Sequence, residues 1–111
     1  MKIKLYQIGL KRDKRNLMFI DYARTRAKGG IDAGEYEKVF EGSINSKNLD
    51  EAYKTFNILS LLPKGYRGRS MSISDVIVTE TGGAFFVDRV GFRRIEFDER
   101  LTHPFVPKEA T

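Results

Sequence analysis

Residues 68–78 (GRSMSISDVIV) predict a tight polar loop that leads directly into a buried strand. Serine alternates with Met71 and Ile73 over residues 70–74, the period-two pattern of a strand or of the chain leading into one. Residues 76–78 are β-branched and apolar, which is typical of a strand buried on both faces. We expect short polar side chains to bond nearby backbone groups and to fix the loop. The residues assigned to this structural motif are Gly68, Ser70, Ser72, Ser74 and Asp75, with Asp88 in the following hairpin.

A chain of 111 residues, 41% of them hydrophobic, provides one domain with one core. It has no cysteine, which excludes disulfides, thiolate catalysis and thiolate metal sites and agrees with a reducing compartment. The first twenty residues carry six Lys or Arg, and no window approaches the ~20 apolar residues of a membrane span. We therefore expect a cytoplasmic protein without an export signal or a membrane anchor.

Hydrophobic periodicity and turn residues predict short strands and two helices. The expected elements are a hairpin of strands 2–8 and 16–22, a helix at 23–28, a strand at 35–44, a helix from Asn48 to Asn57, a hairpin of 74–81 and 84–90, and a strand at 92–97. They predict an α+β fold, a single compact domain with a mainly antiparallel sheet and one or two helices packed on one face. The domain is expected to span residues 1–98, and residues 99–111 to form an extended C-terminal tail.

The second predicted helix carries the clearest capping signal. Asn48 is an N-cap candidate, and Glu51 follows three residues later, as in a capping box. An apolar stripe with helical spacing follows, and we expect it to face the core. The residues of this stripe are Leu49, Ala52, Tyr53 and Phe56.

Six short blocks of the chain, taken in order, carry a family resemblance. The blocks are Tyr6-Gln7, 17–19, 36–40, 49–57, 68–76 and 86–92. They resemble the YodL-like domain family of Firmicutes chromosomes, phages and conjugative elements. The resemblance implies a fold of this class, and it implies no particular biochemical activity. Where the family usually has histidine and tyrosine, this chain has Arg69 and Phe86, which weakens an acid–base role at both positions.

The sequence offers no convincing catalytic centre. A serine nucleophile needs a nearby base, yet the chain has one histidine, His103, in a proline-flanked segment, and no Gly-x-Ser-x-Gly elbow. Asp75 and Asp88 could form a carboxylate pair for acid–base chemistry or Mg²⁺ binding, but pairing with arginines is the favoured interpretation. We therefore expect no catalytic residue, metal site, cofactor or small-molecule substrate.

Positive charge is concentrated near the start of the chain. Residues 1–28 carry nine basic and two acidic side chains, in a chain whose net charge is +5. Such asymmetry favours an acidic partner surface. Arginine and tyrosine are common in interface hot spots, and an aromatic side chain between arginines can also stack on a nucleic-acid base. The predicted partner-binding residues are Lys11, Arg12, Lys14, Arg15, Tyr66, Arg67 and Arg69.

These observations predict a non-enzymatic accessory protein of a phage or other mobile element. It is expected to bind and modulate a bacterial host protein, alone or within a nucleoprotein complex. The most concrete form of this hypothesis is an inhibitor of host defence, of anti-CRISPR or anti-restriction type. The alternative is a basic nucleic-acid-binding module of a conjugative element, although no recognition helix, zinc finger or aromatic sheet motif supports it.

Overall fold

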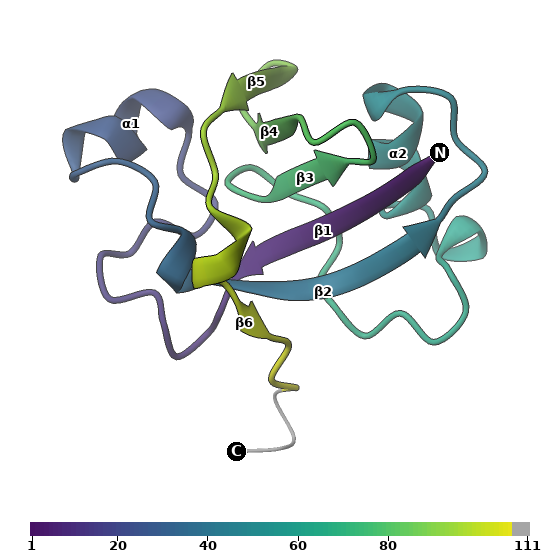
Figure 1. The fold of residues 1–111 in the computed structure, drawn as a ribbon, viewed down its shortest axis with the longest axis horizontal. Helices are drawn as coiled ribbons and strands as arrows, with labels where there is room; N and C mark the ends of the chain where they lie inside the picture. Colours follow the sequence, from purple (N-terminus) through teal and green to yellow (C-terminus); the bar gives the residue numbers. More distant parts are fainter. Residues whose placement is uncertain (108–111) are drawn as a thin grey trace.

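A mainly antiparallel sheet runs through the computed structural model, which describes residues 1–107 (Figure 1). In this part of the chain the sheet has six strands in the order β5-β4-β3-β1-β2-β6, and only β2 and β6 pair in parallel. The strands are β1 (Lys2–Ile8), β2 (Tyr36–Ser43), β3 (Val76–Thr79), β4 (Ala84–Val87), β5 (Phe92–Ile95) and β6 (His103–Pro104). The helices are α1 (Tyr22–Ala27) and α2 (Leu49–Thr55), with 3-10 turns η1 (Ala33–Glu35), η2 (Leu59–Leu61) and η3 (Glu99–Leu101). The predicted α+β class is confirmed.

Successive side chains of the central strands point to opposite faces of the sheet, and a hydrophobic cluster covers each face. Ile3 and Leu5 of β1 pack with Ala52 of α2 and with its C-cap residue Phe56, while Tyr6 and Ile8 belong to a second cluster on the opposite face. In β3, residues 76–78 alternate between the same two clusters and are all buried, as the sequence predicted. Helix α2 thus covers one face of the sheet, and α1 reaches the other through Tyr22.

Helix α2 begins where the capping signal placed it. The side chain of Asn48 accepts a hydrogen bond from Glu51 N at 2.9 Å, and the Asn57 amide donates to Tyr53 O at the other end. Ala52 and Phe56 are fully buried, but Tyr53 is 38% exposed. The prediction that this apolar stripe faces the core is therefore confirmed for Ala52 and Phe56, whereas Tyr53 is partly exposed to solvent.

Residues 16–22 do not form the predicted second strand, and this prediction is wrong. The Asp13 carboxylate accepts hydrogen bonds from Leu17 N and Met18 N, which folds the chain into turns. Asn16 and Phe19 have left-handed backbone angles, φ 57° and 69°, that a strand cannot contain. Strand β1 pairs with β2 and β3 instead, so both of its edges are occupied.

The predicted extended tail is wrong for residues 99–104. Asp98 caps η3 by accepting from Arg100 N at 3.1 Å, and β6 pairs with β2 at Glu37 and Lys38. Glu99 also accepts a 2.6 Å hydrogen bond from the Tyr6 hydroxyl, which ties η3 to the sheet. The rest of the predicted tail includes residues 108–111, which lie outside the described residues. Among residues 1–107, no helix has the length and hydropathy needed to cross a bilayer.

Candidate protein-binding surface

A buried glutamine holds the 66–75 loop against the end of β1. Gln7 is 1% exposed, and its Nε2 donates to Arg69 O at 2.9 Å and to Asp75 Oδ2 at 3.0 Å. Its Oε1 accepts from Arg69 N at 3.0 Å. One amide thus satisfies backbone and side-chain groups that burial would otherwise leave without partners. Nothing in the sequence alone marked Gln7 beyond its place in a family block.

Asp75 closes the same network from the loop side. Its buried Oδ2 accepts from Ser72 N at 2.9 Å as well as from Gln7, and the Ser72 hydroxyl donates to Ser70 O at 3.2 Å. Removal from water raises the pKa of Asp75 to about 7, because burial outweighs the hydrogen bonds that favour the charged form. The backbone bonding expected of Ser72 and Asp75 is present, while Ser70 takes part through its carbonyl oxygen.

Ser74 connects three other parts of the fold. Its N–H donates to Val87 O at 2.9 Å, its Oγ accepts from Phe19 N at 3.0 Å, and its carbonyl oxygen accepts from the Tyr36 hydroxyl at 2.6 Å. The residue is buried and adopts φ 87°, a conformation that these bonds must maintain. Its hydroxyl therefore has a structural partner in a buried setting.

Gly68 and Tyr66 complete the loop. A Cβ on Gly68 would overlap the Tyr66 hydroxyl and lie 2.7 Å from the ring carbon that carries it, so close approach requires glycine here. The Tyr66 hydroxyl donates to Arg69 O at 2.6 Å, and its ring packs against Phe56 with centroids 5.1 Å apart. Arg69 Nη2 in turn donates to Ile8 O at 2.9 Å. Two predicted partner-binding residues, Tyr66 and Arg69, thus also support the loop.

The basic loop of residues 9–20 divides into paired and exposed cations. Arg12 Nε lies 3.1 Å from Glu37 Oε2, and Arg15 contacts both carboxylate oxygens of Glu35 at 2.6 and 3.1 Å. Lys11 and Lys14 are exposed, as is Arg67 on the other loop. The structure therefore separates the predicted binding residues of this loop: Arg12 and Arg15 fasten the loop to β2 and its approach, while Lys11 and Lys14 face solvent.

Phe19 and Leu10 are exposed apolar residues of the 9–20 loop, although the sequence analysis placed Phe19 in a predicted strand of residues 16–22. Phe19 is 54% exposed and Leu10 is 56% exposed. The Arg69 guanidinium lies 5.9 Å from the Phe19 ring centroid and also bonds to Ile8, two residues before Leu10. We call Leu10, Lys11, Phe19 and Arg69 the Phe19 surface. Sequence reasoning missed Phe19 because the turns that expose it depend on Asp13 and Ser74.

The network that fixes this surface lies within the region that a family model recognises. The model, described as YodL-like domain, matches residues 2–97. The chain belongs to the YodL-like domain family. No curated protein and no solved structure matches it. In this YodL-like domain the matched region includes β1 to β5 and ends just before η3.

Asp88 of the YodL-like domain has partners different from those of Asp75. Its Oδ1 accepts from Tyr22 N at 3.1 Å and Arg89 N at 2.8 Å, and its Oδ2 lies 3.6 Å from Arg93 Nε. Burial alone would raise the pKa of Asp88, but these hydrogen bonds and the arginine charge outweigh it and lower the pKa. Asp88 thus joins α1 to the β4-β5 turn, and the hydrogen bonds give the two aspartates separate roles.

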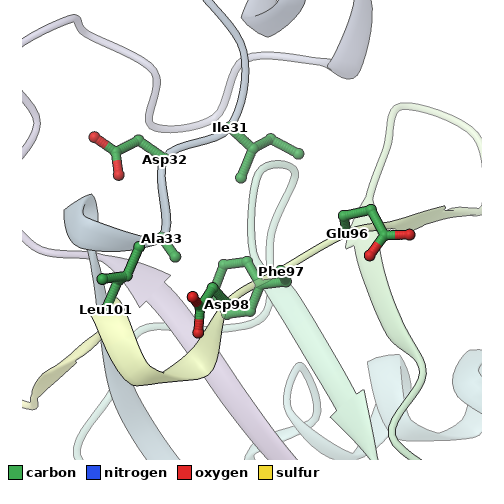
Figure 2. Close-up of a pocket in the computed structure, with 7 residues that line it drawn as sticks. All are labelled: Ile31, Asp32, Ala33, Glu96, Phe97, Asp98 and Leu101. Carbon is green, nitrogen blue, oxygen red and sulfur yellow. The ribbon is translucent and has the colours of Figure 1, made fainter.

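A hollow of about 430 Å³ lies between the segment before η1 and the segment leading into η3 (Figure 2). Its two aspartates are engaged in capping, since Asp32 accepts from Gly34 N and Asp98 from Arg100 N, both within 3.1 Å. Figure 2 shows the Glu96 carboxyl group pointing away from both. Within residues 1–107, no three His, Cys, Asp or Glu side chains gather in a group that could hold a metal ion. The hollow offers weaker support for a site than the Phe19 surface.

Proposed function

We propose that this YodL-like domain is a non-enzymatic module that binds a bacterial host protein through the Phe19 surface. The observation that carries the proposal is the exposed Phe19 ring, which sits on a backbone with φ 69°. The left-handed conformation costs a non-glycine residue ~1–2 kcal/mol, and exposing an aromatic ring gives up apolar burial. A fold that maintains both has a use for the ring at its surface.

The Phe19 surface has the chemistry of an interface hot spot. Aromatic and arginine side chains dominate such hot spots, and here Arg69 stands over the Phe19 ring with its position fixed by Ile8 O. Leu10 adds apolar area and Lys11 adds a positive charge that attracts an acidic partner. Because Arg69 is already held in place, binding would order little additional side chain.

The hydrogen bonds of the polar side chains in the 66–75 loop support a role in stoichiometric binding. Ser72 and Ser74 donate to or accept from the backbone, and the Asp75 carboxylate is buried against Gln7. His103 belongs to β6 and pairs with Glu37 in the sheet register. These arrangements favour binding over turnover, and membership of a family found in phages and conjugative elements favours an inhibitor of host defence, of anti-CRISPR or anti-restriction type, by association.

Capture from bacterial lysate followed by mass spectrometry tests the proposal. The bait is the tagged protein, compared with Phe19→Gly, which removes the ring and suits the left-handed backbone. Leu59→Ala is the matched control, since Leu59 is 86% exposed on η2 and distant in sequence. We expect one partner retained by the parent and Leu59→Ala and lost by Phe19→Gly. A partner that Phe19→Gly retains, or one that is covalently changed at substoichiometric amounts of the protein, would contradict the proposal.

Nucleic-acid binding is the alternative, and the ion pairs of Arg12 and Arg15 count against it because they reduce the charge available for phosphates. If Lys11 and Lys14 neutralise phosphates, affinity for duplex DNA should fall with salt with a log–log slope of about −0.9 per contact. Absence of binding at low salt to duplex DNA, single-stranded DNA and structured RNA would remove this alternative.

A further inference from the structure

Strand β5 ends the sheet on the side opposite β6 (Figure 1). Its four residues, Phe92–Ile95, pair with β4 in the register Ala84↔Ile95 to Val87↔Phe92. Within residues 1–107 no strand lies on its outer side. An edge strand presents a row of backbone donors and acceptors that an extended chain can pair with.

The edge carries arginines on both faces of the sheet. Arg93 lies opposite Phe86 and places its guanidinium 4.4 Å from the Tyr22 ring centroid. Arg94 lies opposite Phe85 and stands 5.6 Å from that ring on the other face. Arg93 is 55% exposed with Asp88 3.6 Å away, so much of its charge faces solvent. An added strand would therefore meet a cation on each of its faces.

Helix α1 lies over one face of the sheet close to this edge, where Tyr22 packs against Phe86. A groove of about 450 Å³ between them is lined by Tyr22, Arg26, Ile31, Arg94 and Ile95, together with Gly30 and Glu96. Arg26 stands 5.9 Å from the Tyr22 ring, which brings a third guanidinium to the same side of the molecule. Glu96, just after β5, is the acidic residue that lines this groove, and Arg26 and Arg94 are the basic residues that line it.

The other open edge of the sheet has different chemistry. Strand β6 pairs with β2 only at Glu37 and Lys38. The Lys38 ammonium group forms an ion pair with Glu41 at 2.6 Å, which neutralises its charge. A second copy of this chain does not suit β5, because antiparallel pairing of two β5 strands would bring arginines together, and like charges across strands are destabilising. The charge at β5 instead favours an acidic occupant.

We propose that β5 accepts an acidic, extended segment of a partner protein as an additional strand of the sheet. Backbone hydrogen bonds along residues 92–95 supply the affinity, and carboxylates beside Arg93 and Arg94 supply the selectivity. This site is separate from the Phe19 surface and does not depend on what that surface binds.

A synthetic peptide of eight residues, in which Glu-Glu pairs alternate with Val-Val pairs, tests the mechanism on the full chain, because this pattern places carboxylates on both faces of an extended strand. Its binding is measured by fluorescence anisotropy, together with versions methylated at alternate backbone nitrogens in either phase, a Lys/Val version and single-stranded oligothymidine. We expect the Glu/Val peptide to bind, the Lys/Val peptide not to bind, and at least one methylated phase to fail because methylation removes ladder donors. Equal binding of both methylated phases would overturn the proposal. So would binding of the oligonucleotide in place of the peptide.

A charge reversal locates the site. Arg94→Glu should weaken the Glu/Val peptide by about fivefold or more, since an attractive cross-strand pair becomes repulsive. Lys47→Glu makes the same change in net charge at an exposed position near α2 and should leave the affinity unchanged. Amide hydrogen exchange on the parent should show new protection in residues 92–95 and none in residues 39–43. Equal weakening by the two variants, or protection confined to β2, would overturn the proposal.

Discussion

Two loops meet near the C-terminal end of β1, and they are held by different physics. The 66–75 loop is fixed from below by Gln7 and Asp75, both at most 1% exposed. In the 9–20 loop, the arginines form partly exposed ion pairs with β2 and the residues before it. These pairs are Arg12 with Glu37 and Arg15 with Glu35. Buried polar groups are costly to leave unpaired, whereas partly exposed pairs contribute less.

The two loops have roles opposite to those that their residue types suggest. Serines and an aspartate in one short segment resemble a reactive site, yet Ser72, Ser74 and Asp75 bond mainly to structural partners. A phenylalanine in an apolar run resembles core, yet Phe19 is exposed because the turns around it are fixed by Asp13 and Ser74. The Phe19 surface thus takes residues from both loops, with Leu10, Lys11 and Phe19 on the 9–20 loop and Arg69 on the 66–75 loop.

The largest expected effect comes from removing the amide beneath the 66–75 loop. Gln7→Leu keeps the volume but leaves Arg69 N and Asp75 Oδ2 without their side-chain partner. Each such group costs ~1–3 kcal/mol, so we expect a loss of roughly 4 kcal/mol in the free energy of unfolding. Urea denaturation followed by circular dichroism measures it. A loss below about 1 kcal/mol would show that the loop does not depend on this network.

The next effect is a dependence of stability on pH. The pKa of Asp75 is raised from 3.8 to about 7, so the folded state holds its proton more tightly than the unfolded chain does. This stabilisation is complete below about pH 4 and is lost as pH rises through 7. We expect the free energy of unfolding to fall by a few kcal/mol between pH 5 and 8. Asp75→Asn, which keeps an acceptor and cannot ionise, should flatten the slope, and an unchanged slope would contradict the assignment.

A smaller effect is expected at the rim of the 9–20 loop. Arg15→Ala removes a two-point contact with Glu35 and a hydrogen bond to Lys28 O. Because the Arg15 side chain is 29% exposed, we expect a loss of about 1 kcal/mol. Lys14→Ala, on the same loop and exposed, should change the stability by less than ~0.5 kcal/mol. Thermal melts of the two variants give the difference, and equal melting temperatures would mean that the ion pair contributes nothing.

The smallest effect on stability is expected at Phe19. Relief of the left-handed backbone in Phe19→Gly offsets the lost ring contacts and the greater freedom of glycine in the unfolded chain. We expect a change within ~0.5 kcal/mol. Leu17→Ala, two residues earlier and buried, should cost about 2–5 kcal/mol. If Phe19→Gly is as damaging as Leu17→Ala, the ring is part of the core and the Phe19 surface loses its basis.

Local signals in the sequence predicted the parts of the fold that depend on neighbours in the chain. The Asn48 cap, the hairpin of β3 and β4 and the β-branched run at 76–78 each depend on signals within a few residues, and each was predicted, although β3 ends at Thr79 and the turn begins before the Gly82-Gly83 pair. Residues 16–22 were assigned to a strand because residues 17–20 are all apolar. Their actual conformation is set by Asp13 and by Ser74, and Ser74 is more than fifty residues away, where no local pattern reports it.

The candidate surface was predictable only in part, because the sequence shows where the charged residues are but not which partners they meet in the fold. Charge composition identified both loops, and Lys11, Lys14 and Arg67 are exposed as a binding role requires. Composition could not distinguish Lys11 and Lys14 from Arg12 and Arg15, whose partners Glu37 and Glu35 lie on or just before β2. Gln7 was beyond prediction because a buried amide in a strand has the same sequence signature as an exposed one.

Ser74 has a consequence for how often the Phe19 surface exists in its displayed form. Its bonds to Phe19 and Tyr36 span 55 and 38 positions of the chain, so they form only after the strands between them have assembled. We therefore expect the 16–20 segment to close late during folding and to detach early in the native state. The apparent affinity of a partner that needs this segment closed scales with the closed fraction. The exchange rate of the Phe19 amide hydrogen therefore provides a direct measure of that fraction.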